Sequence, residues 1–418
     1  MVAIRRALSV IVVVALSQLA GTRMLASAFP LTLTGDLGGA AYVINVPLNW
    51  NGTLVVYQHG YRDVADHPGE IEDHSAHFDP PALAAFLQSQ GYATAASAFT
   101  VNGYNIEEGV RDTKTLIEYF RDAVGPPQRT ILYGVSGGAT MSAAALEGGH
   151  GLYDGAVGAC GVMAGTPLFF DRELVFMLAY QAAFGVPASW GTPGDVRDDL
   201  DFDTEVRPIV LPQVMNPANF GRFEFIRLVA GLPSAGFYPG AVLTHMFFNT
   251  EARAQLERKF GGAGVQNLDH SYSLSAGDQS YLSSLGVDSA TLLGGMNASR
   301  IYAAVPSVRR AMEKWAALDG KIKKPLLTMH AKFDTLATPD NETVYRDKVD
   351  AADRSDNLMQ VFTNGVGHCT FTAPQAFAAI QALESWIDTG AKPALTFFPA
   401  SAGFVHDFTP PAWPYPVQ

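Results

Sequence analysis

The stretch Arg129–Leu146 constrains the fold of this chain more than any other. An apolar run at residues 130–133 has the β-branched, aliphatic and aromatic composition of a buried strand. The sequence Gly134-Val135-Ser136-Gly137-Gly138 follows it, and an alanine-rich segment with high helix propensity comes next. A strand that passes directly into a helix strains the backbone at the central serine, and flanking glycines remove the side chains that would prevent this turn. We therefore predict a sharp turn that exposes the Ser136 hydroxyl.

The predicted place of Ser136, at the start of a helix, suits a nucleophile. Backbone N–H groups at a helix N-terminus favour the negative charge that develops when a hydroxyl attacks a carbonyl. Glycine and serine also fill ordinary turns, so the motif alone leaves a purely structural turn as the alternative. Residues elsewhere in the chain must decide between the two.

The composition is that of a globular protein with a large core. The chain has 418 residues, of which 48% are hydrophobic and 16% are charged, enough for one large domain with an insertion or for two domains. The formal net charge is −12. Because nucleic-acid binding needs a basic face, this charge argues against a nucleic-acid partner.

The first 28 residues have the pattern of a secretory signal peptide. Arg5-Arg6 precedes an apolar segment, Ala7–Ala20, and Ala26-Ser27-Ala28 offers small residues for cleavage. The apolar segment is shorter than a membrane span, so we expect a secreted protein, extracellular or periplasmic, without a stable membrane anchor. A retained N-terminal anchor is the alternative. Export permits a disulfide between the two cysteines, Cys160 and Cys369, which are otherwise two buried thiols.

Strands and helices alternate along two parts of the chain, residues 29–164 and 320–390. Parallel strands need connections whose helices pack on both faces of the sheet. The sequence therefore predicts an α/β fold with a mostly parallel central sheet and helices on both faces. The expected strands lie at residues 31–34, 41–46, 53–57, 92–99, 130–133, 153–160, 324–330 and 357–362, and further helices at 81–90, 106–124 and 374–387.

Two other segments do not follow this alternation. Residues 165–319 contain helical stretches without strand–helix units, at 170–184, 220–230, 242–260, 278–285 and 301–317. We expect them to form a helical cap, or lid, whose aromatic residues make its own core and in part line an acyl or aromatic substrate pocket. The tail, residues 391–418, is rich in proline and aromatic residues. We expect it to wrap the surface without regular structure, with contact to a carbohydrate or polymer as the alternative.

Two residues beyond the expected cap are candidates to act with Ser136. Asp334 follows the strand at 324–330 and so lies at the carboxyl edge of the sheet, where it can orient a histidine. A turn-forming role for Asp334, or Asp171 as the acid, are the alternatives. His368 stands on a glycine-flanked loop before a helix, from which it can act on Ser136 as a general base, with a structural loop histidine as the alternative. The order Ser136, Asp334, His368 is the one expected of α/β-hydrolases.

The end of the strand at residues 53–57 supplies candidates for the rest of the site. The sequence His59-Gly60-Tyr61 predicts that the Tyr61 N–H is one oxyanion donor, with the Gly137 N–H as the other, and a plain strand-end turn is the alternative. We also expect His59, Asn102 and Tyr104 to contact the substrate.

Residues 63–80 hold three histidines among carboxylates, a combination that can ligate a metal. Their spacing matches no closed zinc pattern, and a solvated loop explains them as well. We therefore expect neither a metal nor an organic cofactor.

Together these motifs resemble a secreted α/β-hydrolase of the esterase and lipase type. The resemblance covers about residues 30–165 and 320–390, and is carried by His59-Gly60, Gly134–Gly138, Tyr153–Gly161, Met329–Asp334 and Gly367–Thr372. It implies an α/β-hydrolase fold and a serine hydrolase that cleaves carboxylic esters, of small molecules or polymers, through an acyl-enzyme. A serine peptidase, an acyltransferase and a non-catalytic secreted binding protein are the alternatives.

The pair His368-Cys369 is also similar to tannases and feruloyl esterases, in which a cysteine after the histidine bonds to one beside the serine. Val135 stands beside Ser136 here, so Cys160 is the only substitute for that cysteine. The resemblance thus implies a disulfide that stabilises the histidine loop, although the family's own cysteine is missing.

Overall fold

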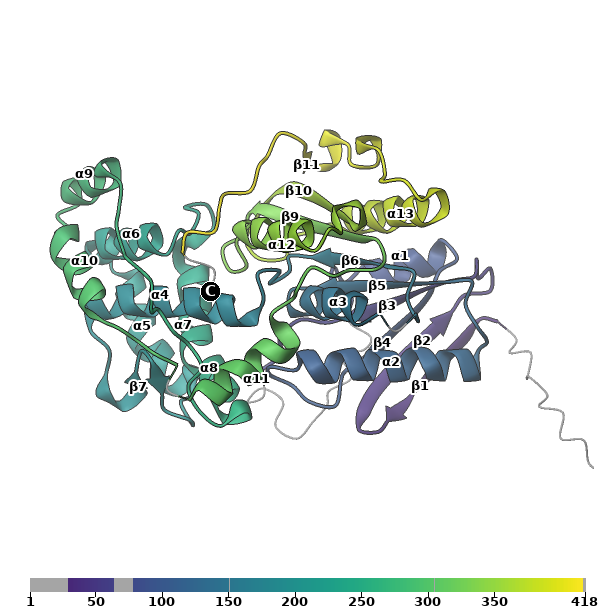
Figure 1. Cartoon of the computed structure of the whole chain (residues 1–418), viewed down its shortest axis with the longest axis horizontal. Helices are drawn as coiled ribbons and strands as arrows, with labels where there is room; N and C mark the ends of the chain where they lie inside the picture. The colour runs from purple at the N-terminus through teal and green to yellow at the C-terminus, as the bar shows by residue number, and fades with distance from the viewer. Residues whose placement is uncertain (1–28, 64–77, 150, 304, 416–418) are drawn as a thin grey trace, which may run out of the picture.

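The computed structural model describes residues 29–63, 78–149, 151–303 and 305–415; the expected signal peptide and His67, His74 and His77 lie outside them. Within the described residues, a nine-stranded sheet runs through the core in the order β1-β2-β4-β3-β5-β6-β9-β10-β11 (Figure 1). Its strands are β1 (Leu31–Leu37), β2 (Ala40–Val46), β3 (Thr53–Gln58), β4 (Ala93–Ser97), β5 (Arg129–Val135), β6 (Gly155–Ala159), β9 (Leu326–Phe333), β10 (Leu358–Val366) and β11 (Phe404–Val405).

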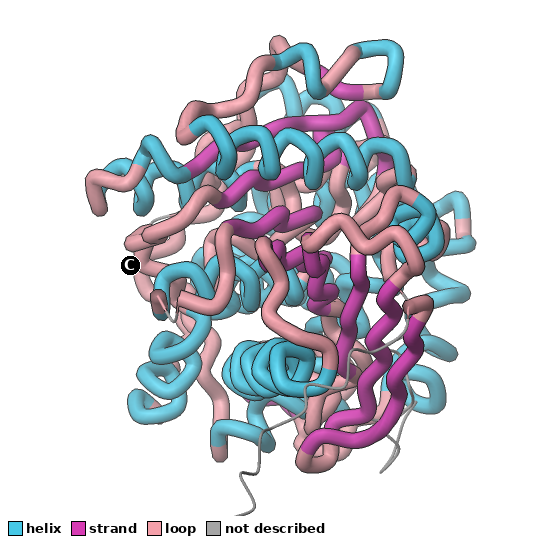
Figure 2. The backbone as a smooth tube through the Cα atoms, turned by 90° about the vertical axis from the view of Figure 1, so that its right-hand side faces the viewer, coloured by secondary structure: helices cyan, strands magenta, loops and turns pink. Residues whose placement is uncertain are grey.

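The strand directions identify the fold. β1 pairs antiparallel with β2, and β2 antiparallel with β4. From β4 through β3, β5, β6 and β9 to β10, all neighbours are parallel. An antiparallel start followed by a parallel sheet in this order is the α/β-hydrolase fold, so the predicted fold class is confirmed. Figure 2 shows the twist of the sheet between its helical layers.

Helices cover both faces of the sheet. α1 (Leu83–Ser89) and α13 (Ala373–Thr389) pack on one face, in an apolar cluster with strand residues such as Val55. α2 (Ile106–Ala123), α3 (Gly137–Gly148) and α12 (Asp340–Ala351) contribute to the cluster on the other face. Thr372 is the N-cap of α13, in a capping box in which the Thr372 hydroxyl accepts a hydrogen bond from the Gln375 N–H.

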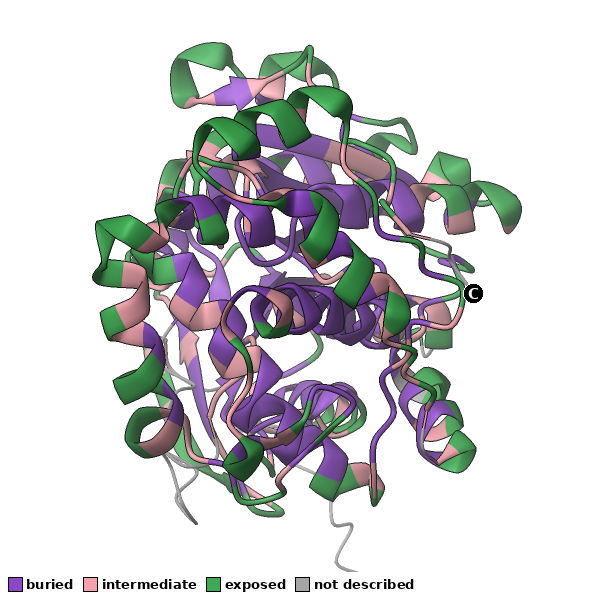
Figure 3. Cartoon of the chain, turned by 90° about the vertical axis from the view of Figure 1, so that its left-hand side faces the viewer, coloured by how far each residue is buried: buried purple, intermediate pink, exposed green. Residues whose placement is uncertain are grey.

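Between β6 and β9 the chain forms a layer of helices, which we call the helical insertion (residues 166–316). It has its own apolar core, in which Phe176, Phe223 and Phe237 are fully buried, and its exposed residues lie on its outer faces (Figure 3). Its helices are α4 (Thr166–Phe184), α5 (Arg207–Met215), α6 (Phe220–Val229), α7 (Val242–Asn249), α8 (Glu251–Phe260), α9 (Ala276–Ser284), α10 (Ser289–Ala298) and α11 (Pro306–Ala316), and it also holds the short strands β7 (Gly191–Thr192) and β8 (Asp195–Val196).

The insertion differs from the sequence prediction in three places. The single helix expected over 242–260 is two helices, because the backbone leaves the helical region at Thr250 (φ −123°, ψ −92°). The helices α5 and α10 were not predicted. Pro212 interrupts the helical pattern of α5, and the pair Gly294-Gly295 lowers the helix propensity of α10.

The C-terminal tail is more regular than its composition predicted. Its strand β11 pairs antiparallel with β10 at the edge of the sheet, so the expectation of no regular structure is wrong there. The tail then crosses to the insertion (yellow trace in Figure 1). There the Trp413 ring lies 5.2 Å from the Arg172 guanidinium, and the Tyr415 hydroxyl donates a 2.5 Å hydrogen bond to the Val229 carbonyl. The tail thus joins the sheet to the helical insertion.

Candidate active site

Ser136 lies on the sharp turn that joins β5 to α3. Its backbone has φ 56° and ψ −121°, which is unfavourable for a residue with a side chain. The neighbouring glycines make the turn possible. A Cβ on Gly134 would lie 2.1 Å from the Gly138 carbonyl oxygen, and one on Gly138 would lie 1.9 Å from the Gln58 carbonyl oxygen. Both positions therefore require glycine for close packing of the backbone.

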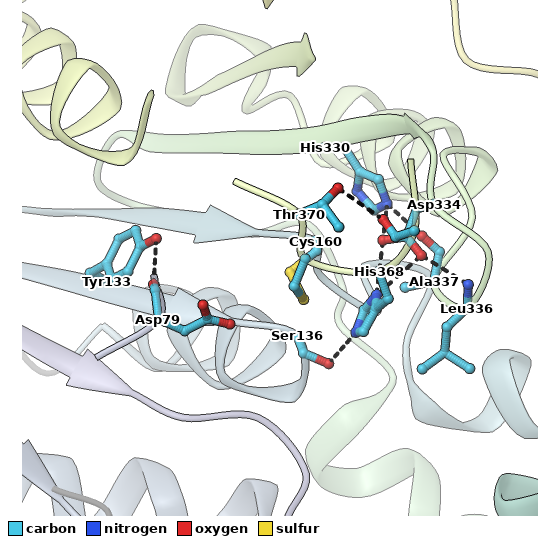
Figure 4. The surroundings of a disulfide bond; sticks show 12 residues. Asp79, Tyr133, Ser136, Cys160, His330, Asp334, Leu336, Ala337, His368 and Thr370 are labelled. Carbon is cyan, nitrogen blue, oxygen red and sulfur yellow. Dashed lines mark hydrogen bonds and ion pairs between the residues drawn. A yellow bond between two sulfur atoms is a disulfide. The ribbon is translucent and has the colours of Figure 1, made fainter. Parts of the chain in front are cut away.

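Ser136, His368 and Asp334 form a chain of hydrogen bonds (Figure 4). Ser136 Oγ lies 2.8 Å from His368 Nε2, and His368 Nδ1 lies 2.9 Å from Asp334 Oδ2. Asp334 is fully buried, and its Oδ1 accepts a 2.9 Å hydrogen bond from the Leu336 N–H. The structure thus brings together the three residues that the sequence singled out, with the carboxylate at the buried end and the hydroxyl at the cavity.

A disulfide holds the loop that carries His368. Cys369 is bonded to Cys160, which directly follows β6, and the two Cα atoms are 5.2 Å apart. The loop is also fixed by a 3.0 Å hydrogen bond from the Gly367 N–H to the Phe333 carbonyl at the end of β9. The pairing implied by the tannase resemblance is therefore present. Within the described residues, the candidate metal-ligand cluster consists of these two bonded cysteines and His368, which leaves no thiolate to bind a metal.

The two backbone groups expected to bind an oxyanion lie beside Ser136. Tyr61 follows β3, Gly137 begins α3, and both line the same cavity as Ser136. A Cβ on Gly137 would lie 3.6 Å from the Tyr61 nitrogen, so the two backbones are close. The Tyr61 hydroxyl donates to the Gln255 side chain of α8, which anchors this segment to the helical insertion.

Two cavities meet at Ser136. The first has a volume of about 50 Å³ and is mainly apolar; it is lined by Tyr61, Gly103, Tyr104, Asn105, Ile106, Ser136, Gly137, Thr140, Met141, Val162, Thr166, Phe169, Phe170, Phe248 and Leu336. The second has a volume of about 550 Å³ and reaches His368; it is lined by Tyr57, Gly60, Tyr61, Arg62, Phe78, Asp79, Pro81, Val135, Ser136, Thr244, Phe247, Phe248, Leu336, His368 and Cys369. The insertion contributes Phe169 and Phe170 to the first, Phe247 to the second and Phe248 to both, so its residues form part of the wall of each cavity.

The three residues expected to contact substrate have different places. Tyr104 lines the smaller cavity. Asn102 lies instead in an outer depression with Lys259. His59 is buried below the site, where its ring packs on Phe99 and its Nδ1 lies 2.7 Å from the Gly60 carbonyl oxygen. The structure therefore does not bring His59 or Asn102 to the wall of either cavity beside Ser136.

Asp171, the alternative acid, is paired within the insertion. Its carboxylate accepts hydrogen bonds from the Arg309 guanidinium at 2.8 Å and from the Gln266 N–H at 2.9 Å. Burial raises the pKa of Asp171 to about 6, although Arg309 opposes the shift. These contacts give Asp171 a structural place that differs from that of Asp334.

Sequence reasoning missed two buried histidine–carboxylate pairs that contact the turn after Asp334. His330 of β9 lies 3.1 Å from Glu342 of α12, and His245 of α7 lies 2.9 Å from Glu173 of α4. His330 lies in β9, four positions before Asp334, and this spacing is visible in the sequence. The partners Glu342 and Glu173 gave no local signal, because each comes from a different helix.

Comparison with known proteins gives one distant relative in sequence. No protein-family model matches the chain. An o-phthalyl amidase from Xanthobacter agilis is 24% identical over 423 residues, which cover 86% of this chain and 88% of that protein. The strand order and the geometry at Ser136, together with this relative, support a serine hydrolase in general.

Two solved structures of esterases show a weak likeness to the chain. Feruloyl esterase B from Aspergillus oryzae has a TM-score of 0.43 and 15% identity, covering 87% of this chain and 80% of that one. An esterase from Pyrococcus furiosus has a TM-score of 0.41 and 13% identity, covering 85% of this chain and 89% of that one. At TM-scores this low, these likenesses carry no weight for function.

Proposed function

We propose that the protein is a serine hydrolase that cleaves carboxylic esters through an acyl-enzyme. Ser136 is the nucleophile, His368 the general base and acid, and Asp334 the carboxylate that orients His368. The observation that carries this proposal is the unbroken chain of hydrogen bonds from buried Asp334 through His368 to Ser136 on its strained turn.

In the first half of the reaction, Ser136 Oγ bonds to the ester carbon while His368 Nε2 takes its proton, and the carbonyl electron pair moves onto oxygen. The Tyr61 and Gly137 N–H groups donate to that oxygen, and a donor of this kind is worth about 3–4 kcal/mol in the transition state. The electron pair then returns, the bond to the alcohol oxygen breaks, and His368 gives this oxygen the proton.

In the second half, water replaces the alcohol. His368 takes a proton from the water as its oxygen bonds to the acyl carbon, and the bond to Ser136 Oγ breaks as His368 returns the proton to that oxygen. The carboxylic acid leaves, and the hydroxyl of Ser136 and the neutral ring of His368 are restored. Asp334 accepts the Nδ1–H hydrogen bond throughout, which fixes the tautomer of His368.

We propose a place for each half of the substrate from the two cavities. Because His368 must deliver a proton to the leaving group, the leaving group belongs in the 550 Å³ cavity that His368 lines. The acyl group then enters the 50 Å³ apolar cavity, which Ser136 also lines, together with Phe169 and Phe248 of the insertion and Met141 of α3. This arrangement favours a compact apolar acyl group and a larger or more variable leaving group.

A second candidate reaction is cleavage of an amide. The relative that matches most of this chain is named an o-phthalyl amidase, and the same three residues can cleave amides. Amide cleavage requires His368 to protonate a leaving nitrogen instead of an oxygen. The position of His368 on the wall of the larger cavity serves both reactions.

A fluorophosphonate probe, which reacts with activated serines, tests the proposal. We expect labelling of the wild type and none of Ser136→Ala; no labelling of the folded wild type would favour a non-catalytic binding protein.

Matched p-nitrophenyl esters and p-nitroanilides with the same acyl group then separate the two reactions. Turnover of esters alone supports the esterase, and comparable turnover of anilides supports the amidase. Added alcohol that captures the acyl group faster than water would indicate an acyltransferase.

We also propose that the protein is exported. The Cys160–Cys369 disulfide is typical of an oxidising compartment, and the N-terminal 28 residues have the sequence pattern of a signal peptide. Among the described helices, none combines the length and hydropathy needed to cross a bilayer. N-terminal sequencing of protein recovered outside the cytoplasm tests export, and we expect the mature chain to begin near Phe29. A full-length chain confined to the cytoplasm would contradict it.

A further inference from the structure

His330 lies behind Asp334, on the side away from His368, and is fully buried (Figure 4). Its Nδ1 is 3.1 Å from Glu342 Oε1, and its Nε2 is 2.5 Å from the Ala337 carbonyl oxygen. The same Nε2 is 3.6 Å from Asp334 Oδ2. The ring therefore stands between two carboxylates, one of which is the residue that orients His368.

The contacts of the ring favour its protonated form. Nε2 of His330 faces a carbonyl oxygen, and Nδ1 faces a carboxylate oxygen; a carbonyl and an ionised carboxylate can only accept hydrogen bonds. A neutral imidazole carries a single N–H and could donate to only one of these oxygens. Glu342 accepts further hydrogen bonds from the Thr328 hydroxyl and the Gln360 amide, both at 2.6 Å, as expected of a carboxylate. The contacts thus fit an imidazolium paired with Glu342.

The charges around the ring favour the same form. Burial alone would lower the pKa of His330, but the hydrogen bond and charge of Glu342, together with the charge of Asp334, outweigh burial and raise this pKa above its ordinary value. Glu342 faces the ring from α12, and Asp334 faces it from the turn after β9. His368 lies beyond Asp334 and is itself faced by Asp79.

We propose that His330 is a positioning residue for the reaction. As an imidazolium held by Glu342, it stabilises the negative charge of Asp334, holds the Ala337 turn, and sets how tightly His368 binds its proton. This inference rests on the proposed function of Ser136, His368 and Asp334. Because a positive charge beside Asp334 offsets part of the field that the carboxylate exerts on His368, removing it makes His368 bind a proton more tightly.

The chain offers a matched control that contacts the same turn. His245 pairs with Glu173 through Nδ1, and its Nε2 lies 2.7 Å from the Thr335 carbonyl oxygen. It too is buried, holds the turn through a backbone carbonyl and belongs to a histidine–carboxylate pair. Glu173 is to His245 what Glu342 is to His330, but His330 also lies 3.6 Å from Asp334. If the pairs only stabilised the structure, removing either one would have similar effects. A change in the titration of His368 is expected only when His330 is removed.

The experiment compares two double variants, His330→Gln with Glu342→Gln and His245→Gln with Glu173→Gln. Each removes one buried pair and leaves no buried carboxylate without its partner. The first variant also removes the negative charge of Glu342, which opposes the effect of losing His330. Because His330 Nε2 faces Asp334 while Glu342 contacts the Nδ1 atom, the loss of the nearer positive charge should dominate. The readout is the titration of the His368 ring followed by NMR in histidine-labelled protein, with the signal assigned by its loss in His368→Gln. This readout does not depend on turnover. Failure of the folded wild type to react with a fluorophosphonate would therefore contradict the proposed function without deciding the role of His330.

We expect the titration midpoint of His368 to rise by about half a pH unit or more in the first double variant and to stay near the wild-type value in the second. The acid limb of kcat/KM should move with it. An unchanged midpoint in the first variant, or equal shifts in both, overturns the proposal.

If the first variant does not fold, nitrogen-15 spectra of the wild-type rings decide: an imidazolium at His330 near pH 7 supports the proposal, and a neutral ring there overturns it. The His330 signal is assigned by its loss in the single variant His330→Gln, which keeps Glu342.

Discussion

The disulfide between Cys160 and Cys369 ties the residue after His368 to the end of β6, which pairs with β5, the strand that leads to Ser136. The two cysteines are 209 positions apart in the sequence, and the whole helical insertion lies between them. The bond therefore fixes the loop of His368 against the same edge of the sheet on which Ser136 stands.

Removing the disulfide should weaken both stability and activity. For the variant Cys160→Ala with Cys369→Ala, we expect a loss of about 2–5 kcal/mol in the free energy of unfolding, because the crosslink restricts the unfolded chain. We also expect kcat to fall by about tenfold or more, since the His368 loop loses its anchor. Denaturant unfolding and steady-state kinetics measure the two effects. Unchanged kcat would show that the remaining contacts of the loop suffice to position His368.

Gly138→Ala should prevent correct formation of the turn at Ser136. The added Cβ would lie 1.9 Å from the Gln58 carbonyl oxygen, which is too close to be accommodated without moving β3. We expect loss of fluorophosphonate labelling and a large drop in soluble protein. Gly294→Ala in α10 is the control, because nothing lies within 4 Å of its added Cβ and alanine favours the helix. Similar behaviour of the two variants would contradict the steric explanation.

Phe169 and Phe247 should control opposite halves of the substrate. Phe169 lines the smaller cavity and Phe247 the larger one. We expect Phe169→Ala to raise kcat/KM for longer acyl chains relative to acetyl by about tenfold, since it lengthens the acyl cavity. Phe247→Ala should change the preference for the alcohol and leave the acyl preference as it is. A panel of esters that varies one half at a time measures both, and reversed effects would mean that the two cavities are wrongly assigned.

The helical insertion should be more stable near pH 5.5 than near pH 8. Burial raises the pKa of Asp171 to about 6 and the pKa values of Glu251 and Glu257 to about 7. A carboxyl whose pKa is higher in the folded state contributes stability below its unfolded pKa and loses it as pH rises through the folded value. We therefore expect Tm to fall by about 3 °C or more from pH 5.5 to pH 8.

Glu251→Gln tests the origin of that pH dependence. The variant removes one of the three titrations, so the slope of Tm against pH should become shallower by about a third. Differential scanning calorimetry at several pH values gives the slope. A wild-type Tm that rises between pH 5.5 and pH 8 would contradict the assignment.

Arg172 should be a strong link between the insertion and the core. Its guanidinium donates a 2.7 Å hydrogen bond to Asp340 at the start of α12 and lies against the Trp413 ring, and both charged groups are buried. Arg172→Ala leaves a buried carboxylate without its partner, for which we expect a loss of about 3–5 kcal/mol in unfolding free energy. Arg207→Ala breaks an exposed pair with Asp203 and should cost about 1 kcal/mol or less. Equal losses in denaturant unfolding would count against the link.

Local patterns were sufficient to single out Ser136, Asp334 and His368. Each stands at a strand end or on a glycine-flanked loop, and parallel strands bring their carboxyl ends to one edge of the sheet. The direction of side chains was not predictable in the same way. His59 follows β3, whose residues are all buried because helices cover both faces of the sheet. Without a polar–apolar alternation, no local pattern indicates that the ring of His59 points into the core.

Contacts between residues far apart in the sequence could not be predicted either. The strand β11 has two residues, too few for any periodicity, and it exists because β10 offers it an edge. The pair His330–Glu342 depends on how α12 lies on β9, and the pair His245–Glu173 on how α4 and α7 pack together. Such contacts are decided by tertiary packing, and neither residue of a pair carries a sign of its partner.

The unequal cavities beside Ser136 bear on synthesis as well as on hydrolysis. In a medium poor in water, an acyl-enzyme passes its acyl group to an added alcohol and forms a new ester. The 550 Å³ cavity would receive that alcohol, while the 50 Å³ cavity would admit the acid. As a preparative catalyst, the protein should therefore discriminate sharply among acid donors and accept a broad range of alcohols.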